Sequence, residues 1–178
     1  KAVNKEGIKI TYEEFLKKKE IKHKSSGFDI DREKLNSKAF DFQKDITKWA
    51  LKKGRAAIFA DCGLGKTEMQ LDWANQVHKY TEGNILIIAP LSVSLQTKRE
   101  GEKFGIKVNI CRNQNDVKPR INITNYEKLE HFTSDFVGVV LDESSILKSF
   151  AGKMRNYIIE KFANTPYKLA CTATPSPN

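Results

Sequence analysis

The 178-residue chain is 39% hydrophobic, which is enough for one buried core of ordinary domain size. Its 31 lysines and arginines outnumber 22 aspartates and glutamates, and the net charge of +9 fits either a polyanionic partner or a well-solvated surface. The three cysteines lack zinc-site or disulfide-framework spacing, and no apolar run has the length of a signal peptide or a membrane span. We therefore expect a soluble protein of a reducing cytoplasm.

The first 38 residues are polar and rich in lysine, which predicts a basic extension outside the core. Within them, Thr11 and Glu14 have capping-box spacing and favour a short helix in the segment TYEEFLKKKE. The lysines at 17–19 either touch phosphates or form a solvated helix face, and the second explanation is the more common one. We divide the chain into an extension, residues 1–38, and a domain, residues 39–178.

From residue 40 onward, helical and strand patterns alternate. Phe42, Ile46 and Trp49 recur at helical spacing before the terminator Gly54, and the apolar run RAAIFA follows. A second helix ends at Gly83. Beyond it the apolar runs are NILIIAP, KVNIC, INIT, FVGVVL and YKLACT, and the helical segments are SVSLQTKREGEKF, NYEKLEHF and SFAGKMRNYIIEKF. Short apolar runs between helices are typical of buried parallel strands, so we predict a doubly wound α/β fold.

The loop after RAAIFA reads ADCGLGKT and resembles a phosphate-binding loop in which Ala60 replaces the usual first glycine. Gly63 and Gly65 give the backbone the freedom to wrap its N–H groups around an oxyanion. Lys66 can neutralise the β- and γ-phosphates, and Thr67 can place its hydroxyl on Mg²⁺ at the start of a helix. The alternative is a helix-capping turn, which has no use for a lysine followed by a threonine.

Two adjacent carboxylates, Asp142 and Glu143, end the apolar run VVL. An aspartate there can hold magnesium, and a glutamate one residue later can polarise an attacking water. Neighbouring acids also occur in ordinary surface turns, so the pair alone does not establish catalysis. In a parallel sheet that also carries the phosphate loop, both motifs meet at the same edge, where ligands bind.

Six segments in order resemble the successive motifs of the first RecA-like domain of superfamily-two helicases: FQKDITKWA, ADCGLGKT, IIAPLSVSLQTKRE, INITNYEKL, VVLDESSILKS and LACTATPSPN. The match spans about residues 40–178 and is closest to the SWI/SNF-like branch, especially its phage-type and bacterial DNA helicases. It implies a RecA-like P-loop NTPase domain, a mostly parallel sheet with helices on both faces, and ATP and Mg²⁺ as cofactors.

The resemblance also implies a role for each matching residue. Gln43 corresponds to the glutamine that reads adenine, Asp142 to the metal-linked acid, and Glu143 to the general base. The implied sites are a nucleotide site (Gln43, Gly63, Leu64, Gly65, Lys66, Thr67), catalytic residues (Lys66, Asp142, Glu143), metal ligands (Thr67, Asp142) and a segment that couples hydrolysis to nucleic-acid binding (Thr172, Ala173, Thr174).

For nucleic acid, the resemblance points to the loops after IIAP and INIT. Hydroxyls and backbone amides there can hold phosphates without reading sequence. The candidates are Ser92, Ser94, Thr124, Asn125 and Tyr126. Ser92 and Asn125 are equally good helix N-caps, so a structural role remains open for them.

The chain departs from the family pattern after the two acids. Ser144 and Ser145 replace the Ala-Asp or Ala-His with which many relatives link this motif to the Thr-Ala-Thr segment. Chromatin-remodelling ATPases also usually carry one more residue in the phosphate loop. That difference places the chain nearer the phage-type proteins.

The resemblance implies the ATP-binding domain of a DNA helicase or translocase, in a bacterial or phage-infected cell and away from membranes. Expected partners are the DNA backbone and a second RecA-like domain, which this sequence does not contain. Because that second domain supplies arginines worth on the order of 10³- to 10⁵-fold in rate, the isolated chain should hydrolyse ATP poorly. The alternatives are an RNA-dependent ATPase of the same superfamily and a nucleotide-dependent binding module without motor activity.

Overall fold

The computed structural model describes residues 2–3, 9–10, 26–61, 63–144 and 152–173. Near the N-terminus, the two-residue strands β1 (Ala2–Val3) and β2 (Lys9–Ile10) pair antiparallel. The short helix expected around Thr11 lies outside the described residues. None of the helices in the described ranges has the length and apolar character needed to cross a membrane.

The domain is built on one six-stranded sheet in which each described pairing is parallel. Its strand order is β3-β8-β7-β4-β6-β5. The strands are β3 (Arg55–Phe59), β4 (Ile85–Ala89), β5 (Val108–Ile110), β6 (Ile121–Asn125), β7 (Gly138–Leu141) and β8 (Tyr167–Thr172). Each apolar run predicted from the sequence forms one of these strands, and the predicted α/β class is confirmed.

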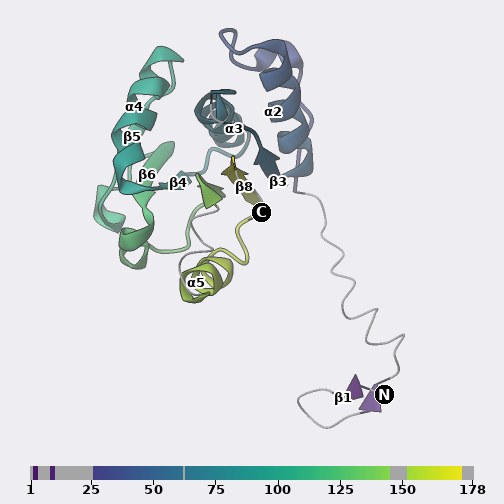
Figure 1. Cartoon of the computed structure of the whole chain (residues 1–178), viewed down its shortest axis with the longest axis vertical. Coiled ribbons are helices and arrows are strands. Elements are labelled where there is room, and N and C mark those ends of the chain that lie inside the picture. Colours follow the sequence, from purple (N-terminus) through teal and green to yellow (C-terminus); the bar gives the residue numbers. More distant parts are fainter. Residues whose placement is uncertain (1, 4–8, 11–25, 62, 145–151, 174–178) are drawn as a thin grey trace.

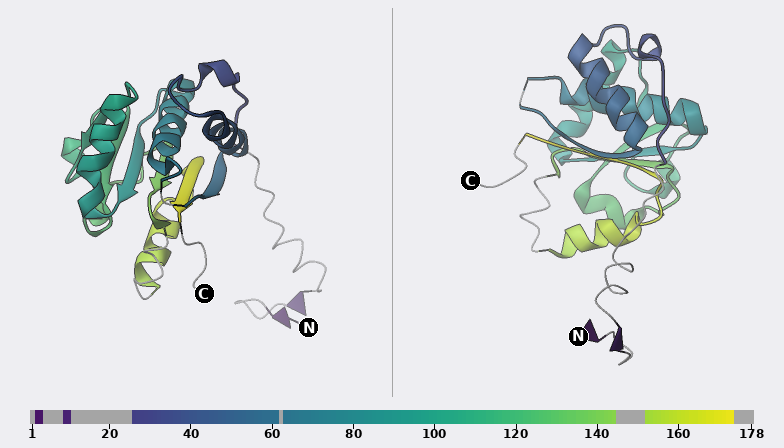
Figure 2. Two further views of the ribbon diagram at one scale, coloured as in Figure 1. Left: turned by 45° about the horizontal axis from the view of Figure 1, so that its top comes forward. Right: turned by 90° about the vertical axis from the view of Figure 1, so that its right-hand side faces the viewer.

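Helices cover both faces of this sheet (Figures 1 and 2). The α-helices are α2 (Asp41–Lys53), α3 (Lys66–Thr81), α4 (Ser94–Lys103) and α5 (Lys153–Lys161). The 3₁₀ helices are η1 (Arg32–Lys34), η2 (Leu91–Val93), η3 (Gln114–Asp116) and η4 (Tyr126–His131). Helices α2, α3 and α4 lie over one face, and α5 lies under the other (Figure 2).

Two apolar cores hold these layers together, because alternate residues of each strand point to opposite faces. On central strand β4, Ile85 and Ile87 belong to the core beneath α2 and α3, which also contains Trp73. Leu86 and Ile88 belong to the opposite core with residues of η4 and α5. Burial on both faces explains why this strand reads as an uninterrupted aliphatic run.

The segment NYEKLEHF, predicted to be helical, forms the short 3₁₀ helix η4. Asn125 caps it by accepting a hydrogen bond from the Lys128 backbone N–H at 3.0 Å. The six residues of η4 complete two tight turns before Phe132 returns to extended backbone, so the stretch is too short to become a longer α-helix.

Part of the segment assigned to the extension packs against the domain. Leu35 is only 4% exposed and belongs to the main core, and the Phe28 ring stacks on Tyr80 with centroids 4.0 Å apart. The Asn36 side chain also donates to the Phe104 carbonyl at 2.9 Å. These contacts fasten residues 28–36 to α3 and α4, while the division of the chain at residue 38 stays a prediction.

Candidate active site

The loop between β3 and α3 has the backbone conformation that an anion cradle needs. Gly63 and Gly65 have φ angles of +88° and +76°, in the left-handed region that favours glycine. A Cβ on Gly65 would also lie 2.1 Å from Gln43 Nε2, so any larger residue would displace that side chain. Gly65 leads directly into α3, whose first N–H groups and positive dipole end face this loop.

Gln43 ties α2 to the loop. Its Nε2 donates to the Leu64 carbonyl at 3.1 Å, and its Oε1 accepts from the Phe40 backbone N–H at 2.9 Å. The second bond closes a capping box at the start of α2. Gln43 is therefore held beside the loop, and the family resemblance implies that it reads adenine.

A cavity of about 440 Å³ opens over this loop. It is lined by Lys38, Phe40, Gln43, Gly63, Gly65, Lys66, Thr67, Glu68, Gln96, Glu100 and Phe104. Its walls thus come from the starts of α2 and α3 and from α4. Two larger hollows, of about 620 and 580 Å³, are not lined by the loop, and the acidic pair lies outside the lining of all three cavities.

Asp142 lies at the end of β7, 7% exposed, and its Oδ1 accepts a hydrogen bond from Gln70 Nε2 at 2.7 Å. Burial raises the pKa of the Asp142 carboxyl, and the Gln70 bond partly offsets that effect. A divalent cation would reverse the penalty by favouring the charged form. Carboxylate and hydroxyl oxygens suit Mg²⁺, so Asp142 and Thr67 form a fitting donor set with nucleotide phosphates.

Glu143 connects the three motifs. Its Oε2 lies 3.9 Å from Lys66 Nζ, and its Oε1 accepts a hydrogen bond from the Thr172 hydroxyl at 2.9 Å. Its φ of +50° is unusual for a residue with a side chain, and such strain concentrates at functional positions. The phosphate loop, the acidic pair and the Thr-Ala-Thr segment therefore meet at one carboxylate.

Strand order explains this meeting. Strand β8 lies between β3 and β7, so Thr172 at its end stands between the phosphate loop and the acids. Ala173 follows and is half-buried, and Thr174 lies outside the described residues. The Thr172 contact supplies a direct link to the acidic motif in a chain that lacks the family's aspartate or histidine.

Sequence reasoning missed Gln70, which orients Asp142. A signal was present: Gln70 lies three residues after Thr67 in α3, so both side chains project from the same helix face. It also missed Glu68, which is 3% exposed and lines the cavity. An acid directly after the Lys-Thr pair was the available clue.

The candidate nucleic-acid residues divide by exposure. Ser92 is exposed on η2, whereas Ser94, Thr124, Asn125 and Tyr126 are buried. The Tyr126 hydroxyl donates to the Asp142 carbonyl at 2.8 Å, and Asn125 caps η4. In this structure those two side chains serve the fold and the acidic motif, so phosphate contacts from the segment would have to use its backbone.

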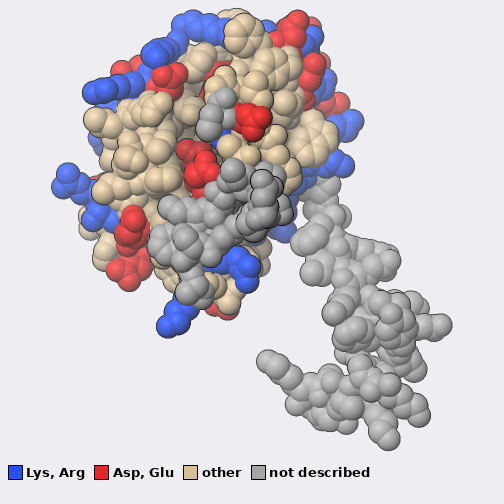
Figure 3. Space-filling model, in the orientation of Figure 1, with Lys and Arg blue, Asp and Glu red and all other residues tan. Residues whose placement is uncertain are grey.

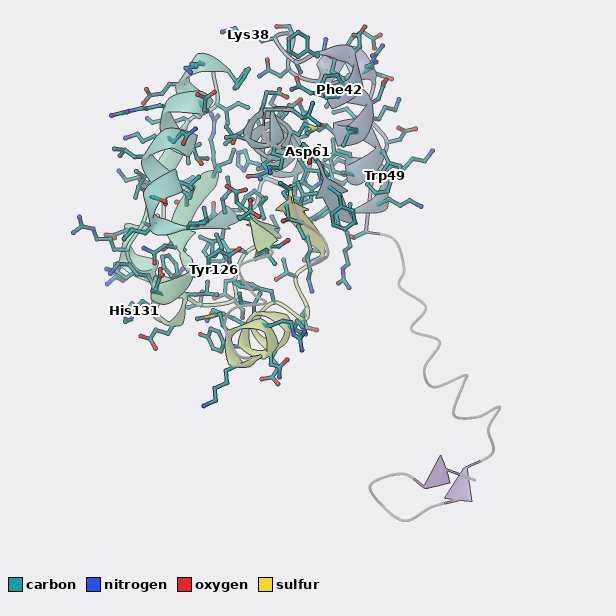
Figure 4. The ribbon with its side chains drawn as sticks, in the orientation of Figure 1. Lys38, Phe42, Trp49, Asp61, Tyr126 and His131 are labelled. Carbon is teal, nitrogen blue, oxygen red and sulfur yellow. The ribbon has the colours of Figure 1, made fainter. Side chains whose placement is uncertain are left out.

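The face that carries the strand ends has an uneven charge distribution. Figure 3 shows acidic atoms at its centre and lysines and arginines mainly around its rim. Figure 4, in the same orientation, places Asp61 near that centre, while Phe42 and Trp49 lie along α2 at the side. Among the described residues, the positive charge of this face therefore lies mainly at the periphery.

The protein family described as Type III restriction enzyme, res subunit, matches residues 33–177. The chain belongs to this family. No curated protein matches the chain.

Solved structures share the fold. The UvsW helicase from bacteriophage T4 matches with a TM-score of 0.66 and 17% identity over 76% of this chain and 52% of UvsW. The Sulfolobus solfataricus SWI2/SNF2 ATPase core in complex with dsDNA gives 0.68 and 21%, over 82% of this chain and 34% of the core. The Type ISP restriction-modification enzyme LlaGI, in complex with a DNA substrate mimic, gives 0.56 and 16% over 80% and 18%.

The chain spans about half of UvsW and smaller shares of the other two relatives. At these identities the likenesses establish the fold. Together with the family match, they identify a first RecA-like domain of the superfamily-two helicase type and confirm the resemblance stated from the sequence motifs.

Proposed function

We propose that this chain is the ATP-binding half of an SWI/SNF-like, phage-type DNA helicase or translocase. ATP hydrolysis drives movement along DNA once the domain is joined to a second RecA-like domain. The observation that carries the proposal is the convergence on Glu143 of Lys66 from the phosphate loop and Thr172 from the end of β8. That convergence gives one carboxylate access to both nucleotide chemistry and the segment implied in coupling.

Lys66 Nζ forms an ion pair with Glu143 Oε2 at 3.9 Å. A triphosphate carries more negative charge than Glu143 and would attract the Lys66 ammonium. Glu143 would then be available to accept a proton from the attacking water while Thr172 fixes its orientation. ATP binding thus exchanges an ion pair within the protein for a phosphate contact and frees the base.

Mg²⁺, held by Thr67 and Asp142 together with the phosphates, would supply neutralisation of the developing charge on the γ-phosphoryl group. The chain's own task there is positioning: Gln70 fixes Asp142, and the start of α3 presents Thr67. Among the described residues no group of three or more acids, histidines or cysteines could hold a metal unaided. A site completed by substrate phosphates suits Mg²⁺.

DNA as the polymer is favoured by two of the similar structures, which are complexes with dsDNA and with a DNA substrate mimic. The net charge of +9 fits a polyanionic track, and contacts through backbone amides would not read sequence. The relative from bacteriophage T4 favours an infected bacterial cell as the setting.

The test is ATP turnover by a chain extended through its second RecA-like domain, measured without nucleic acid and with duplex DNA, single-stranded DNA or RNA. We expect DNA to stimulate turnover. Glu143→Gln should reduce the stimulated rate by about 10²- to 10⁴-fold. The side chain at position 143 in this variant keeps an oxygen that can accept a hydrogen bond from Thr172, so ATP binding and folding should persist. Glu127→Gln, at an exposed acid on η4, is the matched control and should retain full turnover.

Stimulation by RNA alone would favour the RNA-dependent ATPase. Tight ATP binding with turnover indifferent to every polymer would overturn the motor proposal in favour of a nucleotide-dependent binding module.

A further inference from the structure

Glu68 is a buried acid without a described hydrogen-bond partner. It is the third residue of α3, directly after Thr67, and it lines the 440 Å³ cavity while only 3% exposed. Among the described residues neither of its carboxyl oxygens has a hydrogen-bond partner. A buried polar atom left unpaired destabilises the folded chain, so a position that keeps two of them calls for an explanation.

The acid one turn further along α3 provides the contrast. Asp72 is also buried, but its Oδ2 accepts from the Asn36 backbone N–H at 2.9 Å and its Oδ1 accepts from Gln76 at 3.0 Å. Asp72 therefore fastens the segment before α2 to the domain, and its role is structural. Glu68 has neither kind of bond, and it is one of the residues that line the cavity.

The position of Glu68 within the cavity indicates which part of a nucleotide would satisfy it. The N–H groups and the ammonium of the loop from Gly63 to Lys66 would bind the phosphates, and a carboxylate would repel those phosphates. The base belongs beside Gln43, and the next residue of α2, Lys44, is close enough to influence the Glu68 charge. Glu68 therefore lines the same cavity as the phosphate loop and Gln43, where a nucleoside offers hydroxyl and amino donors.

We propose that Glu68 recognises the nucleoside of the bound nucleotide by accepting a hydrogen bond from a ribose hydroxyl or from the 6-amino group of adenine. The inference rests on the proposed ATP-binding function and adds to it a residue that sets nucleotide preference. The nucleotide would supply a donor to one of the two oxygens that have no partner among the described residues of the chain alone.

Two opposite effects of Glu68→Leu follow. Removing an unpaired buried carboxyl should stabilise the nucleotide-free chain, and we expect its Tm to rise by about 3 °C. The same change removes the acceptor, and ATP should bind about 10- to 100-fold more weakly, the usual range for a hydrogen bond to a charged group. Glu68→Gln keeps an acceptor oxygen and should bind ATP within about threefold of the wild type.

The experiment is isothermal titration of the wild type, Glu68→Leu and Glu68→Gln with ATP and three analogues. The analogues are 2′-deoxy-ATP, 3′-deoxy-ATP and purine riboside triphosphate, which lacks the 6-amino group. In the wild type, the analogue that lacks the recognised donor should bind about 10-fold more weakly than ATP. In Glu68→Leu, ATP and that analogue should bind equally, which identifies the donor.

Two controls separate the possible failures. Lys66→Ala must abolish binding of all four nucleotides, and Glu102→Leu, at an exposed acid of α4, should change none of the affinities. If the wild type binds no nucleotide, the proposed function itself fails. If the wild type binds ATP but Glu68→Leu weakens none of the nucleotides, or weakens all four equally, the inference is overturned. Should Glu68→Leu fail to fold, Glu68→Ala enters the same comparison.

Discussion

The nucleotide cavity and the segment formed by β6 and η4, residues 121–131, differ in whether their buried polar side chains have hydrogen-bond partners. At the cavity, both oxygens of Glu68 are buried without a hydrogen-bond partner among the described residues. In the β6–η4 segment, Asn125 caps the helix and Tyr126 donates to a main-chain carbonyl, and Thr124 is the exception whose hydroxyl has no described partner. At the cavity the two unpaired oxygens of Glu68 lie on a lining residue, whereas the hydrogen-bonded side chains of the β6–η4 segment hold the fold. Within the described part of the chain, other unpaired buried atoms lie outside the cavity, among them Trp73 Nε1 and Thr97 Oγ1.

This difference has a consequence for mutation. Changes at the unpaired Glu68 should alter ligand binding and leave stability intact or improved. Changes in the β6–η4 segment should lower stability and leave nucleotide chemistry nearly unchanged.

The largest expected effect is on the pH dependence of stability. Burial raises the pKa of Glu68 from 4.5 to about 7, with Asp72 adding to the shift. Between these two pH values the folded chain keeps the proton that the unfolded chain has released, so stability falls as pH rises. The loss should approach on the order of 3 kcal/mol across that window.

Denaturant unfolding between pH 4.5 and 8, without Mg²⁺ or nucleotide, measures this loss. Glu68→Gln cannot titrate and should flatten most of the slope. A smaller slope should remain, because burial also raises the pKa of Asp72 and of Asp142. If stability depends on pH in the same way in the variant and the wild type, folding does not raise the pKa of Glu68.

Gln70→Leu should weaken the use of Mg²⁺ by the extended chain. Gln70 holds Asp142 with a 2.7 Å hydrogen bond, and loss of a residue that orients a metal ligand typically costs 10- to 100-fold in metal affinity or activity. The Mg²⁺ concentration for half-maximal turnover should rise by about that factor.

Gln76→Leu is the matched control for Gln70→Leu. Gln76 lies on the same helix and bonds Asp72 and the Lys34 carbonyl, and it has no described bond to the acidic pair. Its replacement should lower stability without moving the Mg²⁺ requirement. If both variants shift that requirement equally, the effect belongs to α3 as a whole and Gln70 has no special role.

Asn125→Ala changes the β6–η4 segment and should lower stability without affecting nucleotide binding. It removes the cap of η4, in which the Asn125 side chain accepts from the Lys128 N–H at 3.0 Å, and the expected cost is about 1 kcal/mol. For a chain of this size Tm should fall by about 3 °C, as measured by thermal unfolding. ATP affinity should stay within about twofold, because Asn125 is not part of the cavity lining. Asn125→Asp retains a capping oxygen and should restore most of the stability.

The sequence predicted the sheet well because burial on both faces turns each strand into an aliphatic run. The run at 85–89 is the clearest case, and all five of its residues are buried. Helix type was harder to predict at η4. Its pattern is helical, but only the length available before Phe132 decided between an α-helix and a 3₁₀ helix.

The candidate site was predictable wherever backbone geometry restricts residue choice. The φ of +76° and the close approach of Gln43 both require a glycine at position 65. A requirement for glycine can be recognised in the sequence. The environment of a polar side chain cannot be recognised in this way. Ser92 and Asn125 both follow an apolar run in the sequence, yet Ser92 is exposed and Asn125 is buried. Their environments depend on packing between distant segments.

The smallest expected effect is that of Ser92→Ala, which tests whether an exposed polar residue behind a strand contacts nucleic acid. Ser92 is exposed on η2, and its hydroxyl has no described hydrogen bond that folding would lose. Tm should therefore change by less than about 1 °C. If the loop after β4 holds a DNA phosphate through this hydroxyl, affinity of the extended chain for duplex DNA should fall by about two- to fivefold, equally for unrelated sequences. Fluorescence anisotropy with two unrelated duplexes measures both the loss and its independence of sequence. Unchanged affinity would leave backbone amides and the basic rim as the contacts with DNA, whereas a loss confined to one duplex would contradict recognition through the phosphate backbone.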